Sequence, residues 1–367
     1  MPLALLARLA AFVIGAYVVY ATLLSAFRTF LLPRAAPDPI TRAVFSVLRQ
    51  LFDWRIRVMH TYVERDGLMA YYGPLGILML LVAWLILILL GYTLLYWALG
   101  VESPDLDRWM AALTVSGSSL FTLGSATVNA TAPKLLTFSE AAIGPILIAL
   151  LIGYMPTIYG AFSKREALVN LLEVRAGSPP AATDLIIRFT RLHRPERIGE
   201  MWVQWEAWFS ELEETHTSLA MLNFFRSPNP EHSWVTASGA VLDAAAMVLA
   251  AVDIPPNVQA NLCIRAGYIA LRRIADFFRL PYDPDPKPTD PISVTQKEFD
   301  EALKILEEEG VPLKSDRDQA WRDWAGWRVN YDAPLLALAK MTMAPPAPWS
   351  SPEMGEQRRP PRFGRGS

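Results

Sequence analysis

The chain has 367 residues, of which 52% are hydrophobic and 19% are charged, and its mean hydropathy is +0.23. This balance is not that of an ordinary soluble protein. The single cysteine, Cys263, excludes a disulfide framework and a cysteine-rich metal site. The net charge of −2 argues against bulk binding of nucleic acid. Charged residues are absent from particular stretches of the sequence, and the prediction of the domain organisation starts from these uncharged windows.

The first window is a run of 19 uncharged residues between Arg8 and Arg28. A helix needs about twenty residues to cross a bilayer, so this window predicts a transmembrane helix within residues 1–33. A cleavable secretory signal peptide is the alternative interpretation, because an arginine precedes the apolar stretch.

Two further windows have no charged residue, at residues 67–100 and 141–163. A buried helix of a soluble protein shows a polar face, and the first of these two windows has none. The second contains glycine and proline, which spans tolerate because neighbouring groups satisfy the freed backbone. Both windows predict membrane-spanning helices.

Residues 109–133 form a different window, which is uncharged yet rich in Ser, Thr and Gly. Its first half predicts a short helix, and its second half predicts irregular backbone. Irregular backbone at membrane depth persists only where it is buried in protein or lines a water-filled cavity. We therefore expect a re-entrant loop between the two spans. A polar fourth span and an extracellular Ser/Thr-rich loop are the alternatives.

The basic residues predict the orientation of the spans. Six arginines lie between the first two spans: Arg34, Arg42, Arg49, Arg55, Arg57 and Arg65. Arg108 and Lys134 are the basic residues between the next two spans, among four acidic ones. Since basic residues favour the cytoplasmic side, the N-terminus is expected outside and the C-terminal half in the cytoplasm.

The linker at residues 34–68 has apolar residues at helical spacing with arginines between them. This pattern predicts a cytoplasmic amphipathic helix that lies on the inner membrane surface. Packing of this helix on the cytosolic domain is the alternative.

The stretch Phe121-Thr122-Leu123-Gly124-Ser125-Ala126 resembles the selectivity filter of potassium channels, whose pattern is T-V-G-Y-G. In that filter, rings of backbone carbonyls replace the hydration shell of the ion where several chains meet on an axis. The resemblance extends over residues 72–166. A stretch at residues 171–180, LLEVRAGSPP, widens it to most of the chain.

The chain as a whole resembles bacterial two-transmembrane pore-loop ion channels, potassium-channel-like, with a C-terminal helical cytosolic domain. The resemblance implies a pore domain at residues 69–165 and a homotetramer in the lipid bilayer. It also implies monovalent cations such as K⁺ as permeant ligands, with no bound cofactor.

The likeness to the filter breaks at three positions. Ser125 replaces the aromatic residue, Ala126 replaces the second glycine, and Thr127 replaces an acidic residue that often follows. An alanine in the left-handed conformation of that glycine would cost about 1–2 kcal/mol per subunit. We therefore expect weak potassium selectivity, a wider hydrated path, or no conduction.

Three sets of site residues follow from this interpretation. The expected ion-conduction filter is Thr122, Leu123, Gly124, Ser125 and Ala126. Gly153 and Pro156 form an expected gate hinge, because helices kink at such residues. Glu102, Asp105 and Asp107 form an expected outer vestibule that concentrates cations. The alternatives are close helix packing for the small residues and a solvated loop for the acids.

Residues 166–343 predict a helical cytosolic domain. Helices are expected at about 181–193, 197–222, 233–252, 256–279, 295–309 and 316–341. A proline-rich connector at 281–291 and a disordered basic tail at 344–367 complete the chain. Glu213 and His216 share a helix face, where a buried, hydrogen-bonded histidine is favoured over a metal ligand.

The sequence thus predicts an all-α membrane protein that acts as an oligomeric cation channel, gated or assembled by its cytosolic domain. A non-conducting membrane scaffold or sensor is the alternative. No phosphate-binding glycine loop and no hydrolase motif occurs in the sequence, so an enzyme is not expected. An unidentified cytosolic regulator is a further expected partner.

Overall fold

The structure is a computed structural model that describes residues 2–32, 38–192, 198–255 and 257–351. Within these ranges the chain is helical, without strands apart from two isolated β-bridges. It divides into two compact units. The first comprises Met1–His60 and Leu68–Gly160, and the second comprises Thr61–Gly67 and Ala161–Ser367.

Three helices are long and apolar enough to cross a membrane, which confirms the three predicted windows and indicates a membrane protein. The helices of the first unit are α1 (Pro2–Phe30), α2 (Pro39–Ile56), α4 (Tyr72–Leu99), α5 (Arg108–Leu120) and the first part of α6 (Thr131–Ala176). The short α3 (Tyr62–Met69) precedes α4. Residues 33–37 lie outside the described residues, and 34–37, with Arg34, belong to the predicted linker.

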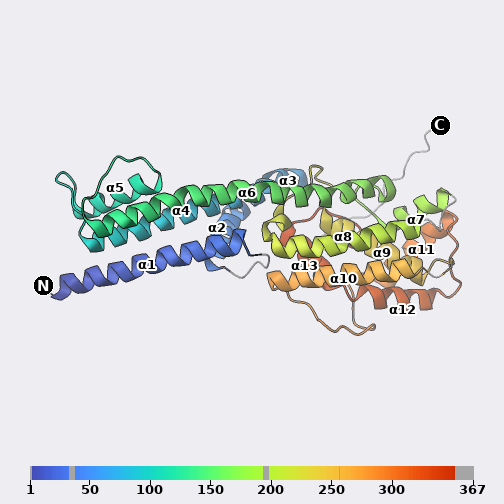
Figure 1. Cartoon of the computed structure of the whole chain (residues 1–367). Coiled ribbons are helices and arrows are strands. Elements are labelled where there is room, and N and C mark those ends of the chain that lie inside the picture. The colour runs from blue at the N-terminus through green and yellow to red at the C-terminus, as the bar shows by residue number, and fades with distance from the viewer. Residues whose placement is uncertain (1, 33–37, 193–197, 256, 352–367) are drawn as a thin grey trace. The chain divides into compact units, whose positions relative to one another are not determined.

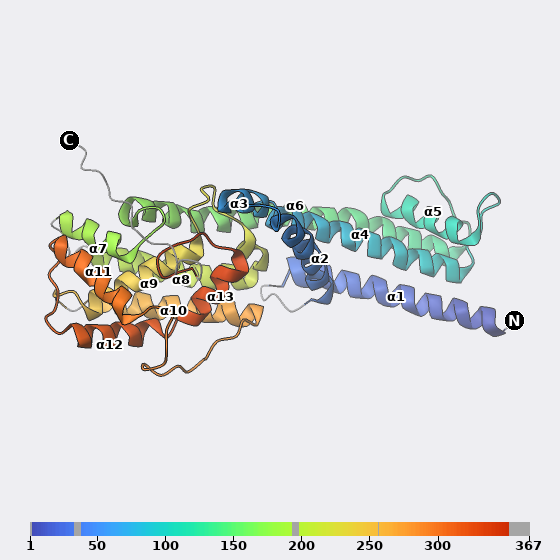
Figure 2. The same cartoon turned by 180° about the vertical axis from the view of Figure 1, so that it is seen from behind.

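Helices α1 and α4 lie side by side and meet at two glycines (Figures 1 and 2). A Cβ atom on Gly15 would lie 2.6 Å from the carbonyl oxygen of Gly91, so the two backbones approach closely. Small residues permit such close contacts between helices in a bilayer. The hydrophobic effect does not drive helix association there, because the lipid tails are as apolar as the side chains. Leu5 and Leu9, on other faces of α1, are 71% and 61% exposed, as expected for residues that contact lipid.

Helix α2 packs its buried face on α4, where the ring of Phe45 fills the space beside Gly76. Its other face carries exposed Val47, Leu51 and Trp54. The predicted amphipathic helix is therefore present. Within the first unit, one of its apolar faces packs on α4, and a second apolar face is exposed.

The second unit surrounds the buried helix α9. Its elements are α7 (Ala182–Arg191), α8 (Ile198–Ser218), the 3₁₀ helix η2 (Ala220–Phe224), α9 (Trp234–Ala250), α10 (Val258–Phe278), α11 (Gln296–Glu308), α12 (Arg317–Arg328) and α13 (Asp332–Thr342). Nearly every residue of α9 is buried, and α7, α10, α12 and α13 pack around it. Alanine and other small or apolar residues predominate in α9, which suits this central position.

The predicted helix at 316–341 is wrong, because two helices, α12 and α13, occupy this range. Pro334 lies in the first turn of α13. Its ring lacks an N–H and would collide with the carbonyl group of residue 330 if the helix continued. The predicted helix at 197–222 likewise ends at Ser218, after which the chain tightens into η2.

A buried ion-pair network holds the C-terminal part of this unit. Both carboxylate oxygens of Asp243 lie 2.6 Å from Nη1 of Arg328, and the Tyr331 hydroxyl donates to Asp243 at 2.8 Å. The Arg328 guanidinium also donates to the carbonyl oxygen of Trp349. Residues 344–351 therefore pack on the unit, and the predicted disordered tail begins too early. Residues 352–367 of that tail lie outside the described residues.

His216 is fully buried beside Arg165, and Glu213 pairs with Arg273 instead. Within the described ranges no group of three or more His, Cys, Asp or Glu residues can hold a metal ion. The carbonyl oxygen of Leu212 lies 2.9 Å from Nδ1 of His216, so this nitrogen carries the proton. Burial, and then the charge of Arg165, lower the pKa of His216 well below 6.5.

We predict that Gly15→Leu weakens the contact between α1 and α4. The larger side chain must displace the backbone of α4, and such overpacking costs about 1–3 kcal/mol. The thermal unfolding midpoint of the protein in detergent should therefore fall. The neighbouring Ala16 is exposed, so Ala16→Leu is the control and should leave the midpoint unchanged.

We also predict that the stability of the folded state decreases below about pH 6.5, because the unfolded chain then protonates His216 while the folded chain keeps it neutral. The free energy of unfolding should fall by up to about 1.4 kcal/mol per pH unit from this residue. The measurement compares unfolding midpoints of the wild type and His216→Gln between pH 7.5 and about 5. Parallel curves for the two proteins would contradict the prediction.

Candidate functional site

Helix α5 begins beside the last turns of α4. Asp107 caps its N-terminus, accepting hydrogen bonds from the backbone N–H groups of Trp109 at 2.9 Å and Met110 at 3.0 Å. The Arg108 guanidinium donates to the carbonyl oxygen of Trp97 at 3.0 Å and stacks over the ring of that residue. Asp107 was expected in an outer vestibule, and it also starts α5.

From this start α5 runs back along α4 and reaches α6 toward its C-terminal end. The hydroxyl of Ser116 lies 3.0 Å from the carbonyl oxygen of Leu89, far from the end of α4 at Leu99. A Cβ atom on Gly144 of α6 would lie 2.2 Å from the carbonyl oxygen of Leu120. The C-terminal end of α5 therefore contacts α6 well inside that apolar helix.

Glu140 connects the three helices α4, α5 and α6. Its side chain is fully buried and accepts hydrogen bonds from Ser116 on α5, at 2.5 Å, and from the Tyr96 hydroxyl on α4, at 2.9 Å. In the sequence, Glu140 is one of the four acidic residues between the second and third apolar windows and precedes the third one directly. Because α6 begins at Thr131, before that window, Glu140 instead lies within the helix.

After α5 the chain turns and returns beside it. The N–H group of Leu123 donates to the carbonyl oxygen of Ser118 at 2.8 Å, and the N–H group of Ala126 donates to the Ser118 hydroxyl at 3.0 Å. The stretch is irregular from there to Thr131, where α6 starts. Figure 1 shows this short helix beside α4, followed by a loop that leads to the start of α6.

Two residues of the return have the left-handed backbone conformation, Thr122 with φ of +53° and Gly124 with φ of +68°. Glycine adopts this conformation freely, whereas a β-branched residue is a rare outlier there. The strain expected at Ala126 lies at Thr122 instead. Such outliers concentrate at functional sites, where the surrounding structure maintains them.

The expected filter residues lie together on an open surface of the chain. Thr122, Leu123, Gly124 and Ser125 are exposed, with Leu123 at 68%, and Ala126 is half-buried. Among their backbone N–H groups, those of Thr122, Leu123 and Ala126 donate to residues of α5. The chain by itself does not enclose this surface.

The other expected site residues lie apart from this stretch. Glu102 and Asp105 are exposed in the loop between α4 and α5. Gly153 and Pro156 lie within α6, which continues unbroken through both. A Cβ atom on Gly153 would have no atom within 4 Å, so packing inside this chain does not require glycine there.

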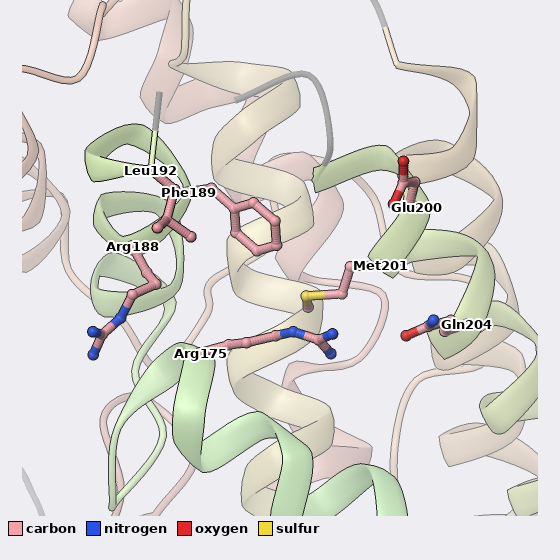
Figure 3. A pocket seen from close by; sticks show the side chains of 7 residues that line it. All are labelled: Arg175, Arg188, Phe189, Leu192, Glu200, Met201 and Gln204. Carbon is pink, nitrogen blue, oxygen red and sulfur yellow. The ribbon is translucent and has the colours of Figure 1, made fainter. Parts of the chain in front are cut away.

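A separate pocket of about 400 Å³ lies in the second unit (Figure 3). It is lined by Arg175, Arg188, Phe189, Leu192, Glu200, Met201 and Gln204. Arg175 extends below Phe189 and Met201 toward Gln204, whereas the guanidinium of Arg188 points away from it. The two cationic groups do not converge on one point, so the pocket has no focused site for an anion.

Comparisons with protein-family models, with curated proteins and with solved structures find no match. The activity of the protein must therefore be inferred from its own residues and geometry. The feature that combines apolar helices, buried polar groups and strained backbone is the α5 hairpin, which we define as α5 and residues 121–130.

We predict that Glu140 holds the α5 hairpin in place. Glu140→Leu removes the acceptor of the buried Tyr96 hydroxyl and one of the two acceptors of Ser116, and a buried hydroxyl left unsatisfied costs about 1–3 kcal/mol. Glu140→Gln keeps a carbonyl acceptor and adds a donor, so it should retain most of the stability. The measurements are the thermal unfolding midpoint and the protease sensitivity of residues 121–130. Equal behaviour of both variants would contradict this role.

Proposed function

We propose that the protein is an oligomeric cation channel whose ion path is formed by the backbone of residues 122–126. The observation that carries the proposal is the α5 hairpin, a short helix and extended return set between two membrane-spanning helices. Irregular backbone at membrane depth requires a protein or water-filled environment, and an ion path supplies the latter. The hairpin therefore acts as a re-entrant loop, not as a fourth span.

The exposed surface of the hairpin supports assembly of several copies around an axis. The carbonyl groups of one chain cannot surround an ion, so further copies are needed to complete a ring. Exposed apolar side chains lie nearby at Phe121, Leu123, Leu135 and Phe138, and neighbouring copies would cover them. The resemblance to potassium channels favours four copies.

The charge pattern supports an orientation in the cell membrane. The arginines of the linker lie on the cytoplasmic side, which puts the N-terminus outside and the second unit in the cytoplasm. The hairpin then enters from outside, with Glu102 and Asp105 at its outer mouth, where their charges would concentrate cations.

The composition of the return favours a hydrated path with weak potassium selectivity. Ser125 gives a hydroxyl where potassium channels have an aromatic ring, and Ala126 lacks the left-handed conformation of the second glycine. Fewer aligned carbonyl groups than in a potassium channel would then replace the water around the ion, so the selectivity between ions of different size would be lower. Gly153, which is not needed for packing, and Pro156 would let α6 bend as a gate.

A non-conducting membrane scaffold or sensor is the second candidate. The side chain of Leu123 is 68% exposed on the surface assigned to the path, and an apolar side chain turned toward the axis would block it. The second unit would then bind a partner without ion flux.

We predict that Gly124→Val abolishes cation flux while assembly is retained. Valine resists the φ of +68° at this position, so the carbonyl groups on either side must turn. The measurement is flux of K⁺, Na⁺ and a large organic cation in liposomes, together with the number of copies in detergent.

Thr127→Val is the matched control, because it introduces the same residue into the return at a position outside residues 122–126 and without the left-handed conformation. It should retain flux. Undiminished flux in Gly124→Val would exclude the proposed path, and a monomeric wild type would exclude the channel.

A further inference from the structure

Arg165, on the part of α6 that belongs to the second unit, is bound to the backbone that follows α8. Its guanidinium donates to the carbonyl oxygens of Leu222 at 2.9 Å and Phe225 at 2.7 Å. It also pairs with Glu166 at 2.8 Å, and Nη1 lies 3.3 Å from Nε2 of the neutral His216. The Arg165 side chain is only 3% exposed, and each of its three nitrogens has a partner.

Arg226, the residue after Phe225, binds a different part of the chain. Its guanidinium pairs with Asp66 and donates to the Tyr62 hydroxyl at 3.1 Å, both on α3. It also donates to the carbonyl oxygens of Thr342 at 2.7 Å and Met343 at 2.9 Å, at the end of α13. The side chains of Arg226 and Asp66 are each 11% exposed, so water screens this pair little.

The five residues 222–226, which we call the coupling segment, therefore hold three separate parts of the chain. They are α6 after it leaves the apolar stretch, α3, which directly precedes α4, and the end of α13. Removal of one partner from a buried ion pair leaves an uncompensated charge. If the coupling segment shifts, the contacts of Arg165 and Arg226 should consequently stay intact, and α6 and α3 should move with the segment.

The coupling segment also has polar atoms that are not satisfied. Within the described residues, Oε2 of Glu166, Oδ1 of Asn223 and Oγ of the adjoining Ser227 are buried without a hydrogen-bond partner. Buried polar groups are nearly always paired, so the unpaired atoms of Asn223, Ser227 and Glu166, which follows Arg165, favour a second arrangement. A second arrangement that pairs them would move the coupling segment.

We propose that the coupling segment transmits movements of the second unit to α4 and α6 together, with Arg165 and Arg226 as its positioning residues. In its gating role this inference rests on the proposed channel function. The contacts themselves predict coupling between α3 and the end of α6 whether or not ions flow.

The first test is hydrogen exchange of the full-length protein in detergent. Arg226→Met removes contacts to α3 and to the end of α13 but none to α6, yet exchange should rise in residues 62–69 and also in 161–176. Arg165→Lys should raise exchange in the same two regions, by about 5- to 150-fold, the range typical of coupled sites. A rise confined to the region that each arginine touches would overturn the proposal.

Matched variants separate coupling from general loosening. Arg191→Met removes an exposed ion pair with Glu309 and should change neither region. Arg226→Lys keeps the charge and should restore part of the protection in both regions. If Arg226→Lys restores α3 alone, the coupling segment does not connect the two regions, and the proposal is wrong.

The second test measures flux in liposomes. Variants of Arg165 and Arg226 should change the rate of flux while the K⁺ to Na⁺ ratio stays that of the wild type, since neither residue lies near residues 122–126 in the sequence. A changed ratio with an unchanged rate would overturn the gating role. If the wild type conducts no ions, the channel proposal fails, and the exchange experiment still decides the coupling.

Discussion

A backbone that turns inside an apolar layer must satisfy its own polar groups, because lipid offers no hydrogen bonds. If the α5 hairpin is the re-entrant loop proposed above, this constraint explains the residues around it. Ser118 accepts from the returning chain, Ser116 and Tyr96 donate to Glu140, and Asp107 caps the start of α5. Small hydroxyl side chains do this without widening the space between helices. The Ser/Thr-rich composition of the window is thus a consequence of the turn.

Close contact between backbones is the second feature of the first unit. Gly15 meets Gly91, and Gly144 meets the carbonyl oxygen of Leu120. In the bilayer, helices associate through close packing and polar contacts and not through exclusion of water from apolar side chains. Gly153 lacks such a contact, and this difference separates a possible hinge from glycines that are required for packing.

The second unit is stabilised differently. Its apolar side chains, tryptophans included, surround α9, and burial of apolar surface from water stabilises it. Two buried arginines, Arg165 and Arg328, then fix irregular segments by binding their carbonyl oxygens. A guanidinium has five donors in a rigid plane, so one side chain can bind several parts of a chain at once. The coupling segment and residues 344–351 both depend on this property.

The three long apolar helices could be predicted from the sequence, because a helix of about twenty uncharged, apolar residues is stable in few environments other than a bilayer. The sequence did not predict the full extent of α6. Charged residues such as Lys134 and Glu140 end an apolar window, but the helix continues through them. The break before α13 was readable from Pro334, but the apolar pattern continued across it and concealed the boundary. The start of the tail was misplaced because Pro-rich composition does not show that Ala347 and Ser350 are buried.

By itself the sequence determined that the protein is helical, that three segments suit a membrane, and that one window between them is too polar for an ordinary span. Each of these depends on composition and spacing along the chain. The tertiary structure alone decided that Glu140 joins three helices, that Thr122 carries the strained backbone, and that adjacent carbonyl and guanidinium groups hold α3 and α6. These contacts join residues far apart in sequence, and only folding sets which buried polar group finds which partner.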